Sequence, residues 1–295
     1  MSDYLWDKSG EDADVERLEG LLGGLEYKGE APEPVTVPPR DWRPLALAAA
    51  ALIAVGGFVW TLPEAGPAFG VTQLEGSSAC GNDPVCALGV GDWLETDEQT
   101  RARVAVADIG HMDVSPSSRL RLLATSGEEH RLELREGRID ATVVAPPRLL
   151  VVETPAATAV DLGCIYTLEV DEDGSGELTV SAGYVALETD ELDVLVPAGA
   201  TARMTPDGPG LPVFWDASDA FVASVEAGAP DLGEARARDT LTLAHALPRV
   251  DRSRREVVLD RIVELSGKDL DRERILDLDR SALAELNTRL EPDWI

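Results

Sequence analysis

Residues 101–145 read "RARVAVADIGHMDVSPSSRLRLLATSGEEHRLELREGRIDATVVA", and apolar residues alternate with polar ones along most of this stretch. Side chains of a β-strand point to opposite faces in turn, so the alternation predicts half-buried strands. Clusters of Gly, Pro, Asp and Ser interrupt the pattern at intervals of roughly 8 to 12 residues, which is typical of turns between short strands. Similar segments lie on both sides, and the sequence therefore predicts a many-stranded β domain over residues 70–214.

Many of the expected strands end in a Gly or Pro corner, as in "REGR", "APPR", "SAGY" and "VPAG". Short strands at even spacing suit a chain that coils into stacked rungs, in which inward Val, Leu and Ile pack on the next rung. We therefore expect an all-β domain of the β-solenoid or roll type, whose sequential strands pair in parallel with neighbours one turn away. A sandwich of two sheets is the second architecture that the pattern allows.

A helical period returns after residue 216, in segments such as "GEARARDTLTLAHALPRV" and "DRSRREVVLDRIVELSG". Apolar residues recur there three and four positions apart, which places them on one face of a helix. We expect residues 216–295 to form a C-terminal α-helical region. Its short helices share a small core or lie against the β domain.

The uncharged run "PLALAAAALIAVGGFVWTL", residues 44–62, is long enough as a helix to cross the hydrocarbon part of a bilayer. Trp42 and Trp60 lie at its ends, where indole rings favour the headgroup boundary. The run is not a signal peptide, because about forty residues precede it and Asp and Glu outnumber Lys and Arg among them. We expect one N-terminal transmembrane helix over residues 43–62, with a buried core helix as the alternative.

Basic residues predict the orientation of this helix. Arg40 and Arg43 lie on its amino side, whereas residues 44–100 contain no Lys, Arg or His. Positive charge near a membrane helix favours the cytoplasmic side. We therefore expect a single-pass protein of the inner (cytoplasmic) membrane, with its N-terminus in the cytoplasm and its C-terminal domains in the periplasm.

The expected cytoplasmic tail, residues 1–42, contains one amphipathic pattern, with apolar residues at helical spacing between residues 15 and 25. A helix this short is marginal alone in water, so its apolar face docks on a partner protein or the segment remains a frayed, solvated tail. The proline-rich stretch "KGEAPEPVTVPPRD" then reads as an extended linker to the membrane. The residues that we expect to touch a partner are Trp6, Leu18, Leu21 and Leu22.

The formal net charge of the 295-residue chain is -29 at pH 7. Contact with nucleic-acid phosphates needs a basic surface, so no nucleic-acid partner is expected. All three cysteines lie beyond the expected membrane helix, where an oxidising compartment permits disulfides.

The stretch "ACGNDPVCAL" contains Cys80 and Cys86, separated by residues that favour a tight loop. Such a loop brings two Cα atoms within disulfide range, so we favour a Cys80–Cys86 bridge over two free buried thiols. Metal ligation is disfavoured, because no second cluster of Cys or His supplies the remaining ligands. Cys164 is left over and is expected to be a small core residue.

Catalytic motifs are missing from the sequence. His111, His130 and His245 lie in turn, strand and helix contexts, without a neighbouring Cys or a zinc-binding spacing. The acidic run "DEDGSGE", residues 171–177, begins like a calcium loop, but Ala182 stands where that loop needs a bidentate Glu. A hairpin turn explains the run better. Phosphate loops, nucleophile elbows and dinucleotide fingerprints are also absent from the sequence, so we expect no enzyme, no cofactor and no bound metal.

Four stretches of the expected β domain together resemble a FecR-type domain: "GVGDWLETDEQTRARVAVADIGHMDVSPSSRLRLL", "VVETPAATAVDLGCIYTLEV", "GELTVSAGYVAL" and "VPAGATARM". They carry the G-x-G-D-x-L-x-T start, the P-x-S-x-L turn and the structural glycines of that family, over about residues 89–204. The chain departs from the family at residues 108–110, where an Asp-Gly pair is usual, and at residues 163–166, where Gly-Thr-x-Phe is usual. None of the shared motifs contains a catalytic residue.

The resemblance implies a β-helix-like sensor domain outside the cytoplasm, one membrane span, and a cytoplasmic segment that binds an extracytoplasmic-function sigma factor. We therefore expect a single-pass signalling protein that senses an envelope signal and regulates a cytoplasmic sigma factor, with an envelope protein or ligand as its exported partner. Residues 1–42 are about half as long as a usual multi-helix anti-sigma domain. The alternative is an envelope structural or adaptor protein whose β domain binds another envelope protein or a glycan.

Overall fold

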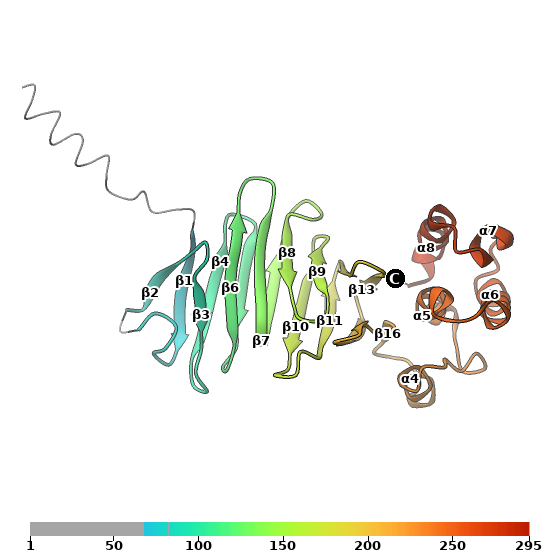
Figure 1. Ribbon diagram of the computed structural model, residues 1–295, viewed down its shortest axis with the longest axis horizontal. Coiled ribbons are helices and arrows are strands. Elements are labelled where there is room, and N and C mark those ends of the chain that lie inside the picture. Colours follow the sequence, from blue (N-terminus) through green and yellow to red (C-terminus); the bar gives the residue numbers. More distant parts are fainter. Residues whose placement is uncertain (1–67, 82, 295) are drawn as a thin grey trace, which may run out of the picture. The chain divides into compact units, whose positions relative to one another are not determined.

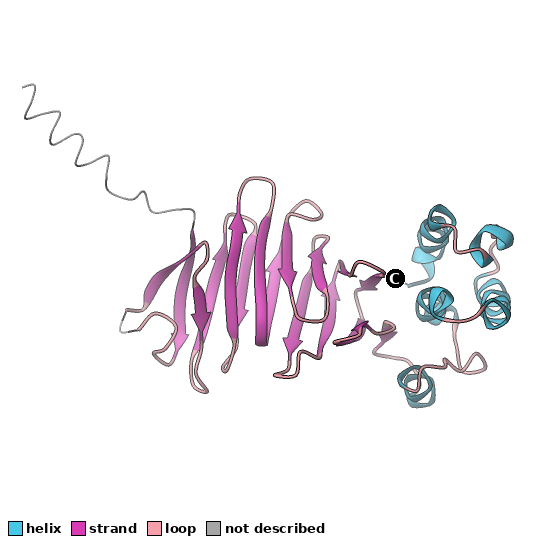
Figure 2. Ribbon diagram, in the orientation of Figure 1, coloured by secondary structure: helices cyan, strands magenta, loops and turns pink. Residues whose placement is uncertain are grey.

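The computed structural model of the protein describes residues 68–81 and 83–294. The expected membrane helix at residues 43–62 and the expected cytoplasmic tail at residues 1–42 lie outside these ranges. Within the described ranges, no helix combines the length and the apolar character needed to cross a bilayer. Strands occupy the described chain up to Phe214 and helices begin at Asp219 (Figure 2), which confirms the expected strand-rich part and C-terminal helical part.

The strands form two sheets that share one long strand and bury a common core (Figure 1). Sheet A contains β1 (Ala68–Glu75), β2 (Val85–Gly89), β4 (Arg101–Val106), β5 (Gly110–Val114), β10 (Ile165–Val170), β11 (Gly176–Ala182), β14 (Ala200–Thr205), β15 (Gly208–Pro209) and β16 (Val213–Phe214). Sheet B contains β3 (Trp93–Glu95), β6 (Arg119–Thr125), β8 (Leu150–Glu153), β9 (Thr158–Asp161), β12 (Tyr184–Glu188) and β13 (Asp193–Pro197). The shared strand is β7 (His130–Val143).

Bent strands connect the two sheets. The first half of β7 pairs with β6 and β8 in sheet B, and its second half pairs with β5 and β10 in sheet A. Later in the chain, the consecutive strands β9–β10, β11–β12 and β13–β14 also pass from one sheet to the other at short corners. Their corners contain Gly163, Gly183 and Gly199, as the bend of β7 contains Gly137, and all four have positive φ. The domain is therefore a meander of hairpins folded over along one crease, and its sheets do not close into a barrel.

Two of the corners need glycine for both backbone and steric reasons. Gly183 has φ +72°, and a Cβ atom there would lie 2.1 Å from the carbonyl oxygen of Gly163. Gly137 has φ +96°, and its Cβ would lie 2.4 Å from the Cα atom of Ser118. Each corner thus packs directly against the corner of a neighbouring strand, and small residues at the crease keep the two sheets close enough to share a core.

The expectation of a β-solenoid with parallel rungs is wrong. Every pairing between described strands is antiparallel except that of β7 with β8. That pair is parallel because β7 ends in sheet A, and the chain returns over residues 144–149 to begin β8 beside the start of β7. The Gly and Pro corners are real, but they bend antiparallel strands from one sheet to the other.

The core between the sheets follows the alternation in the sequence. In β4 every second residue is buried, which places Ala102, Val104 and Val106 inside and the intervening residues outside. Burial of one such valine contributes about 1.5 to 3 kcal/mol. The same pattern in β6, β10, β12 and β14 supplies Leu, Val, Tyr and Met side chains from both sheets.

The helical part contains α4 (Asp219–Glu226), α5 (Thr240–Ala246), α6 (Arg252–Ser266), α7 (Arg272–Leu276) and α8 (Arg280–Trp294). Local sequence sets its boundaries: Ser218 caps α4 by accepting the N–H of Phe221 at 3.2 Å, and Gly267, with φ +64°, ends α6. All residues of α5 are buried, because α6 and α8 pack against this helix and its other side meets the β domain. The apolar residues of the helices and those of the strands belong to one hydrophobic core.

Candidate functional site

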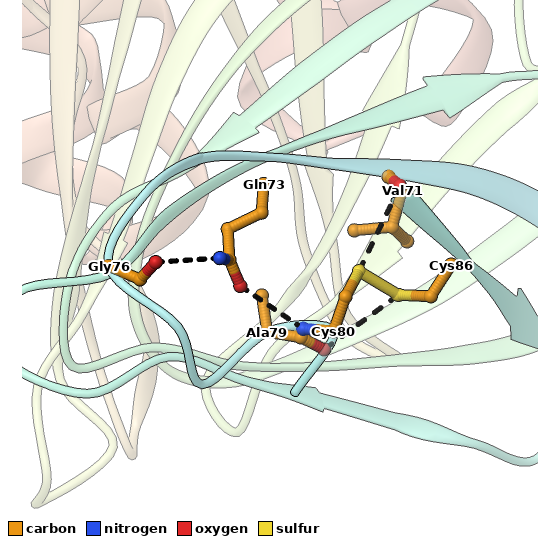
Figure 3. The surroundings of a disulfide bond; sticks show 6 residues. All are labelled: Val71, Gln73, Gly76, Ala79, Cys80 and Cys86. Carbon is orange, nitrogen blue, oxygen red and sulfur yellow. Dashed lines mark hydrogen bonds between the residues drawn. A yellow bond between two sulfur atoms is a disulfide. The ribbon is translucent and has the colours of Figure 1, made fainter. Parts of the chain in front are cut away.

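A disulfide-linked loop between β1 and β2 closes one end of the β domain (Figure 3). The bond joins Cys80 and Cys86, whose Cα atoms lie 5.5 Å apart, within the usual range. Cys86 lies on the same face of β2 as the buried Leu88, because side chains two positions apart in a strand share a face. The bridge therefore faces the core, and both cysteines pack against it.

Polar contacts hold the same loop in place. The Gln73 side chain donates from Nε2 to the carbonyl oxygen of Gly76 at 2.6 Å and accepts the N–H of Cys80 at 3.4 Å (Figure 3). The Thr100 hydroxyl accepts the backbone N–H groups of Ser77 and Ser78, at 3.1 and 3.2 Å. The loop is thus fixed to β1 and to the residue before β4, as well as by its covalent bond.

Exposed apolar side chains occur on both sheets in this part of the β domain, since β2 belongs to sheet A and β3 to sheet B. Among the described residues between 74 and 93, the exposed large hydrophobics are Leu74, Val85, Val90 and Trp93. The Trp93 ring is flanked by the guanidinium groups of Arg119 and Arg121, at 4.8 and 5.4 Å from its centroid.

The opposite end of the β domain is covered by helices. In β13, the backbone N–H of Leu195 donates to Nε2 of His245 in α5 at 3.3 Å. The Thr242 hydroxyl, also in α5, donates to the carbonyl oxygen of Pro212 at 2.6 Å, next to β16. The helical part therefore contacts the last strands of both sheets.

His245 supports this contact in its neutral form. Burial and, to a smaller extent, the nearby Arg249 lower the pKa of its imidazole to about 4. A neutral imidazole has one nitrogen that can accept a hydrogen bond, and here that nitrogen accepts the Leu195 N–H. His245 lies on a helix, as expected from the sequence, and its role in the structure is to hold α5 on sheet B.

The other two histidines also serve the fold. His130 begins β7, where its Nδ1 lies 2.7 Å from the Thr125 hydroxyl and its ring makes an edge contact with Phe69. Burial lowers the pKa of His130. His111 lies within strand β5 and not in the expected turn, because the turn is made by residues 107–109 before it. Across residues 68–81 and 83–294, His, Cys, Asp and Glu form no group of three suited to a metal ion.

Cys164 is a free, buried thiol, which confirms its expected place in the core. It donates to Oδ2 of Asp161 at 2.6 Å, and the N–H of Gly163 donates to Oδ1 of the same carboxyl at 2.6 Å. Burial raises the pKa of both Asp161 and Cys164, so the thiol stays protonated and weakly reactive. The neighbouring Tyr166 hydroxyl is buried without a hydrogen-bond partner among the described residues.

The acidic run at residues 171–177 forms the turn between β10 and β11, which confirms the expected hairpin. The Ser175 hydroxyl donates to Asp173 at 2.5 Å and the Ser175 N–H donates to the same carboxylate at 2.9 Å. These bonds lower the pKa of Asp173. The carboxylate thus stabilises the turn by accepting local hydrogen bonds.

Residues 92–186 match the family described as FecR protein. The chain carries a FecR domain. The matched range begins one residue before β3 and ends within β12, so this FecR domain contains most of the folded-over meander. Strands β1 and β2, the disulfide loop and the helices lie outside the match.

Two crystal structures of a candidate anti-sigma factor from Parabacteroides distasonis ATCC 8503, at 1.65 and 2.50 Å resolution, are similar to this chain. Each shares 17% sequence identity with it at a TM-score of 0.38, over 45% of this chain and 63% of the solved chain. The match therefore spans less than two thirds of the solved chains. No curated protein matches the chain at a significant level.

The structure brings two of the predicted site residues together, Cys80 and Cys86. The predicted partner-binding residues of the tail lie outside the described residues; they are Trp6, Leu18, Leu21 and Leu22. Sequence reasoning missed the contact of His245 with β13, since a lone histidine on a helix carries no sign of its partner. It also missed the edge strand β2, although the uncharged stretch "VCALG" is a sequence signal for an unprotected edge.

Proposed function

We propose that this FecR-domain chain is a single-pass regulator of the cytoplasmic membrane, whose β domain senses a signal in the periplasm and whose residues 1–42 control a sigma factor. The observation that carries the proposal is the FecR match over residues 92–186. In the sequence this domain follows an uncharged run of membrane-spanning length, with Arg40 and Arg43 on the amino side of that run.

A protein with this layout is suited to coupling events on the two sides of the membrane, and it is not suited to transport. One membrane helix has too little surface to build a pathway, but it links an exported domain to a cytoplasmic peptide. An amphipathic segment on the cytoplasmic side supplies an apolar helix face, which is a common mode of binding to a groove in a partner protein. The acidic character of the tail fits a regulator that binds a basic, nucleic-acid-binding protein.

The sigma-factor half is tested by affinity purification of the full chain from its own cells, with mass spectrometry of the bound proteins. We expect a sigma factor to be recovered with the wild type and lost with the double variant Leu18→Glu/Leu22→Glu. A matched control, Glu16→Asp/Glu19→Asp, changes the polar side of the same segment but keeps its charge, and it should retain the partner. Recovery of no sigma factor with the wild type would reject this half.

The topology half is tested by alkaline phosphatase fusions, because that enzyme is active only after export. A fusion after Gly70 should give high activity and a fusion after Arg40 almost none. The reverse pattern would reject the proposed orientation, and with it the assignment of the β domain to the periplasm.

The second candidate function is an envelope adaptor whose β domain binds another envelope protein or a glycan. The exposed side chains of Leu74, Val85, Val90 and Trp93 are available for such contacts. One deletion variant distinguishes the two functions. Removal of residues 2–30 should abolish the response of a sigma-factor regulator but should leave the function of an adaptor unchanged.

A further inference from the structure

The four edges of the two sheets are protected to very different degrees. At the helical end, the edge strand β13 donates the Leu195 N–H to His245, and the last strands of sheet A carry Pro209 and lie beside Pro212. Proline and a covering helix are common means of blocking a sheet edge. At the other end, β3 is only three residues long, and Arg119 and Arg121 flank its Trp93.

Within the described residues, no helix covers strand β2 and no proline lies between Val85 and Gly89. The strand, "VCALG", contains no charge, and it pairs with β1 in continuous register without a bulge. Val85 is 59% exposed and Ala87 is also exposed. An uncharged, regular and exposed edge strand is a template for pairing with another strand.

The register identifies the backbone groups that β2 presents. The N–H of Gln73 donates to the carbonyl oxygen of Pro84 at 2.9 Å, so this is a hydrogen-bonded pair of the β1–β2 ladder. Hydrogen-bonded and non-hydrogen-bonded pairs alternate in an antiparallel ladder. Val85 and Ala87 are therefore in non-hydrogen-bonded positions, and their N–H and C=O groups point away from β1.

The free part of this edge is short and has acidic ends. Asp92 accepts the N–H of Gly89 at 3.1 Å and donates its own N–H to the Gly89 carbonyl at 3.0 Å, which occupies the edge beyond Ala87. Asp83 precedes the strand at its other end. A segment that pairs with Val85 and Ala87 thus lies between two carboxylates.

We propose that β2 binds an extended segment of a partner protein by strand addition, and that this segment has small or β-branched residues in its middle and a Lys or Arg at each end. Main-chain hydrogen bonds to Val85 and Ala87 hold the segment, as in other strand-addition complexes. The exposed Val85 side chain supplies apolar contact, and the flanking carboxylates of Asp83 and Asp92 select basic ends.

Charge argues against a second copy of the chain as the occupant. A two-fold antiparallel pairing centred on Ala87 would place Val85 of one copy opposite Gly89 of the other. It would also bring Asp83 of each copy towards Asp92 of the other, so like charges would meet at both ends. Like charges opposite one another destabilise a strand pair, whereas a partner with basic ends turns the same two sites into attractions.

The inference rests on the sheet edge alone and holds whatever the amino-terminal tail binds. It is tested with the purified full chain in detergent micelles and the peptide acetyl-Lys-Val-Thr-Val-Lys-amide as the probe. Binding is followed by NMR through the amide signals of Val85 and Ala87, because this method reads weak association. A second probe carries Glu in place of both Lys residues.

Two variants distinguish strand pairing at β2 from nonspecific binding of the peptide. Ala87→Pro removes an outward N–H, a substitution that an edge strand tolerates because that N–H is not used in the β1 ladder. Val85→Lys places a positive charge on the edge, which opposes the basic probe. The matched control is Val257→Lys on α6, where the valine is 48% exposed and far from β2 in the sequence.

The Lys peptide should shift the Val85 and Ala87 amide signals, and both edge variants should weaken its binding at least tenfold. The Val257→Lys control should bind like the wild type, and the Glu peptide should bind at least tenfold more weakly than the Lys peptide. Equal binding to Ala87→Pro, or no shift at millimolar peptide, would overturn the proposal. A dimer of the free chain that is lost in Ala87→Pro would overturn it as well, since the occupant would then be a second copy.

Discussion

The two ends of the β domain solve the problem of unpaired strand edges in opposite ways. At the helical end, α5 accepts a backbone N–H of β13 through His245, and the strands and helices share one core. At the disulfide end, the core is closed by a cross-linked loop, but no described residue outside β1 pairs with the backbone of β2 at Val85 and Ala87. Closing a core and covering a sheet edge are therefore separate structural requirements, and among the described residues only the helical end meets both.

The two ends also differ in what stabilises them. The helical end buries large side chains such as Trp294, Phe214 and Phe221. The disulfide end buries mostly aliphatic side chains such as Val71, Leu88 and Leu94, and it adds a covalent bond and the Gln73 and Thr100 contacts. We therefore expect substitutions to have larger effects on stability at the helical end.

The largest effect is expected from Trp294→Ala. Trp294 is fully buried, and its Nε1 donates to the Thr240 hydroxyl at 3.2 Å. Its removal should lower the free energy of unfolding by about 3 to 5 kcal/mol, because a large cavity forms in the helical part. Trp93→Ala, at the open end, should cost less than about 1 kcal/mol. Denaturant unfolding measures both, and equal losses would remove the contrast between the ends.

The second-largest effect is expected from acid, which should lower the free energy of unfolding through the helical end. The pKa of His245 is about 4 in the folded chain, against an ordinary value near 6.5 in the unfolded chain. The unfolded state therefore takes up a proton first as the pH falls, so stability is full above pH 6.5 and declines towards pH 4. The loss should be on the order of 3 kcal/mol.

His245→Gln is the matched control for this pH effect, because a glutamine oxygen can still accept the Leu195 N–H but does not titrate. Between pH 7 and pH 4, the free energy of unfolding should fall more steeply for the wild type than for the variant. Parallel curves would mean that other groups carry the acid sensitivity and that His245 does not.

At the open end, the double variant Cys80→Ala/Cys86→Ala should lower the free energy of unfolding by about 2 kcal/mol. The bridge closes a short loop. Without the bridge, that loop has more conformational entropy in the unfolded chain, which favours unfolding. Reduced wild type should match the double variant, since Cys164 takes no part in the bridge. Unchanged stability would show that Gln73 and Thr100 hold the loop without the bond.

The smallest effect is expected from Val85→Lys. Its side chain is exposed and its outward backbone groups serve no bond within the described fold, so stability should change by at most about 0.5 kcal/mol. The same variant should lose binding of the basic peptide probe. A loss of several kcal/mol in thermal or denaturant unfolding would mean that the valine is covered in the full chain.

The sequence predicted the classes of structure better than their arrangement. Alternation in β4 and the helical period of α6 are local, so both could be read directly. The direction of strand pairing is not local: the corners at Gly137 and Gly183 fit parallel rungs and bent antiparallel hairpins equally well in the sequence. The direction and register of the paired strands, such as Leu168 opposite Leu178 in the antiparallel pair β10–β11, distinguish the two folds.

In the candidate sites, too, local features could be predicted and contacts between distant residues could not. The Cys80 and Cys86 pair lies within ten residues of sequence with turn-forming residues between, so a bond could be predicted from spacing. The contact between His245 and Leu195 joins residues fifty positions apart, which no spacing rule reaches. The edge at β2 is open because no other described strand pairs with its outer side. A sequence pattern predicts the strands but does not predict which strands lie side by side.

Amide hydrogen exchange of the free, full-length chain, resolved by NMR at Val85, Ala87 and Leu195, tests the comparison most directly. All three residues lie in edge strands, but only the Leu195 N–H has a partner in the described fold. The Val85 and Ala87 amides should exchange about a hundredfold faster than that of Leu195, because they are bonded to water. Protection of Val85 and Ala87 equal to that of Leu195 would contradict the account, since the edge of β2 would then already be covered.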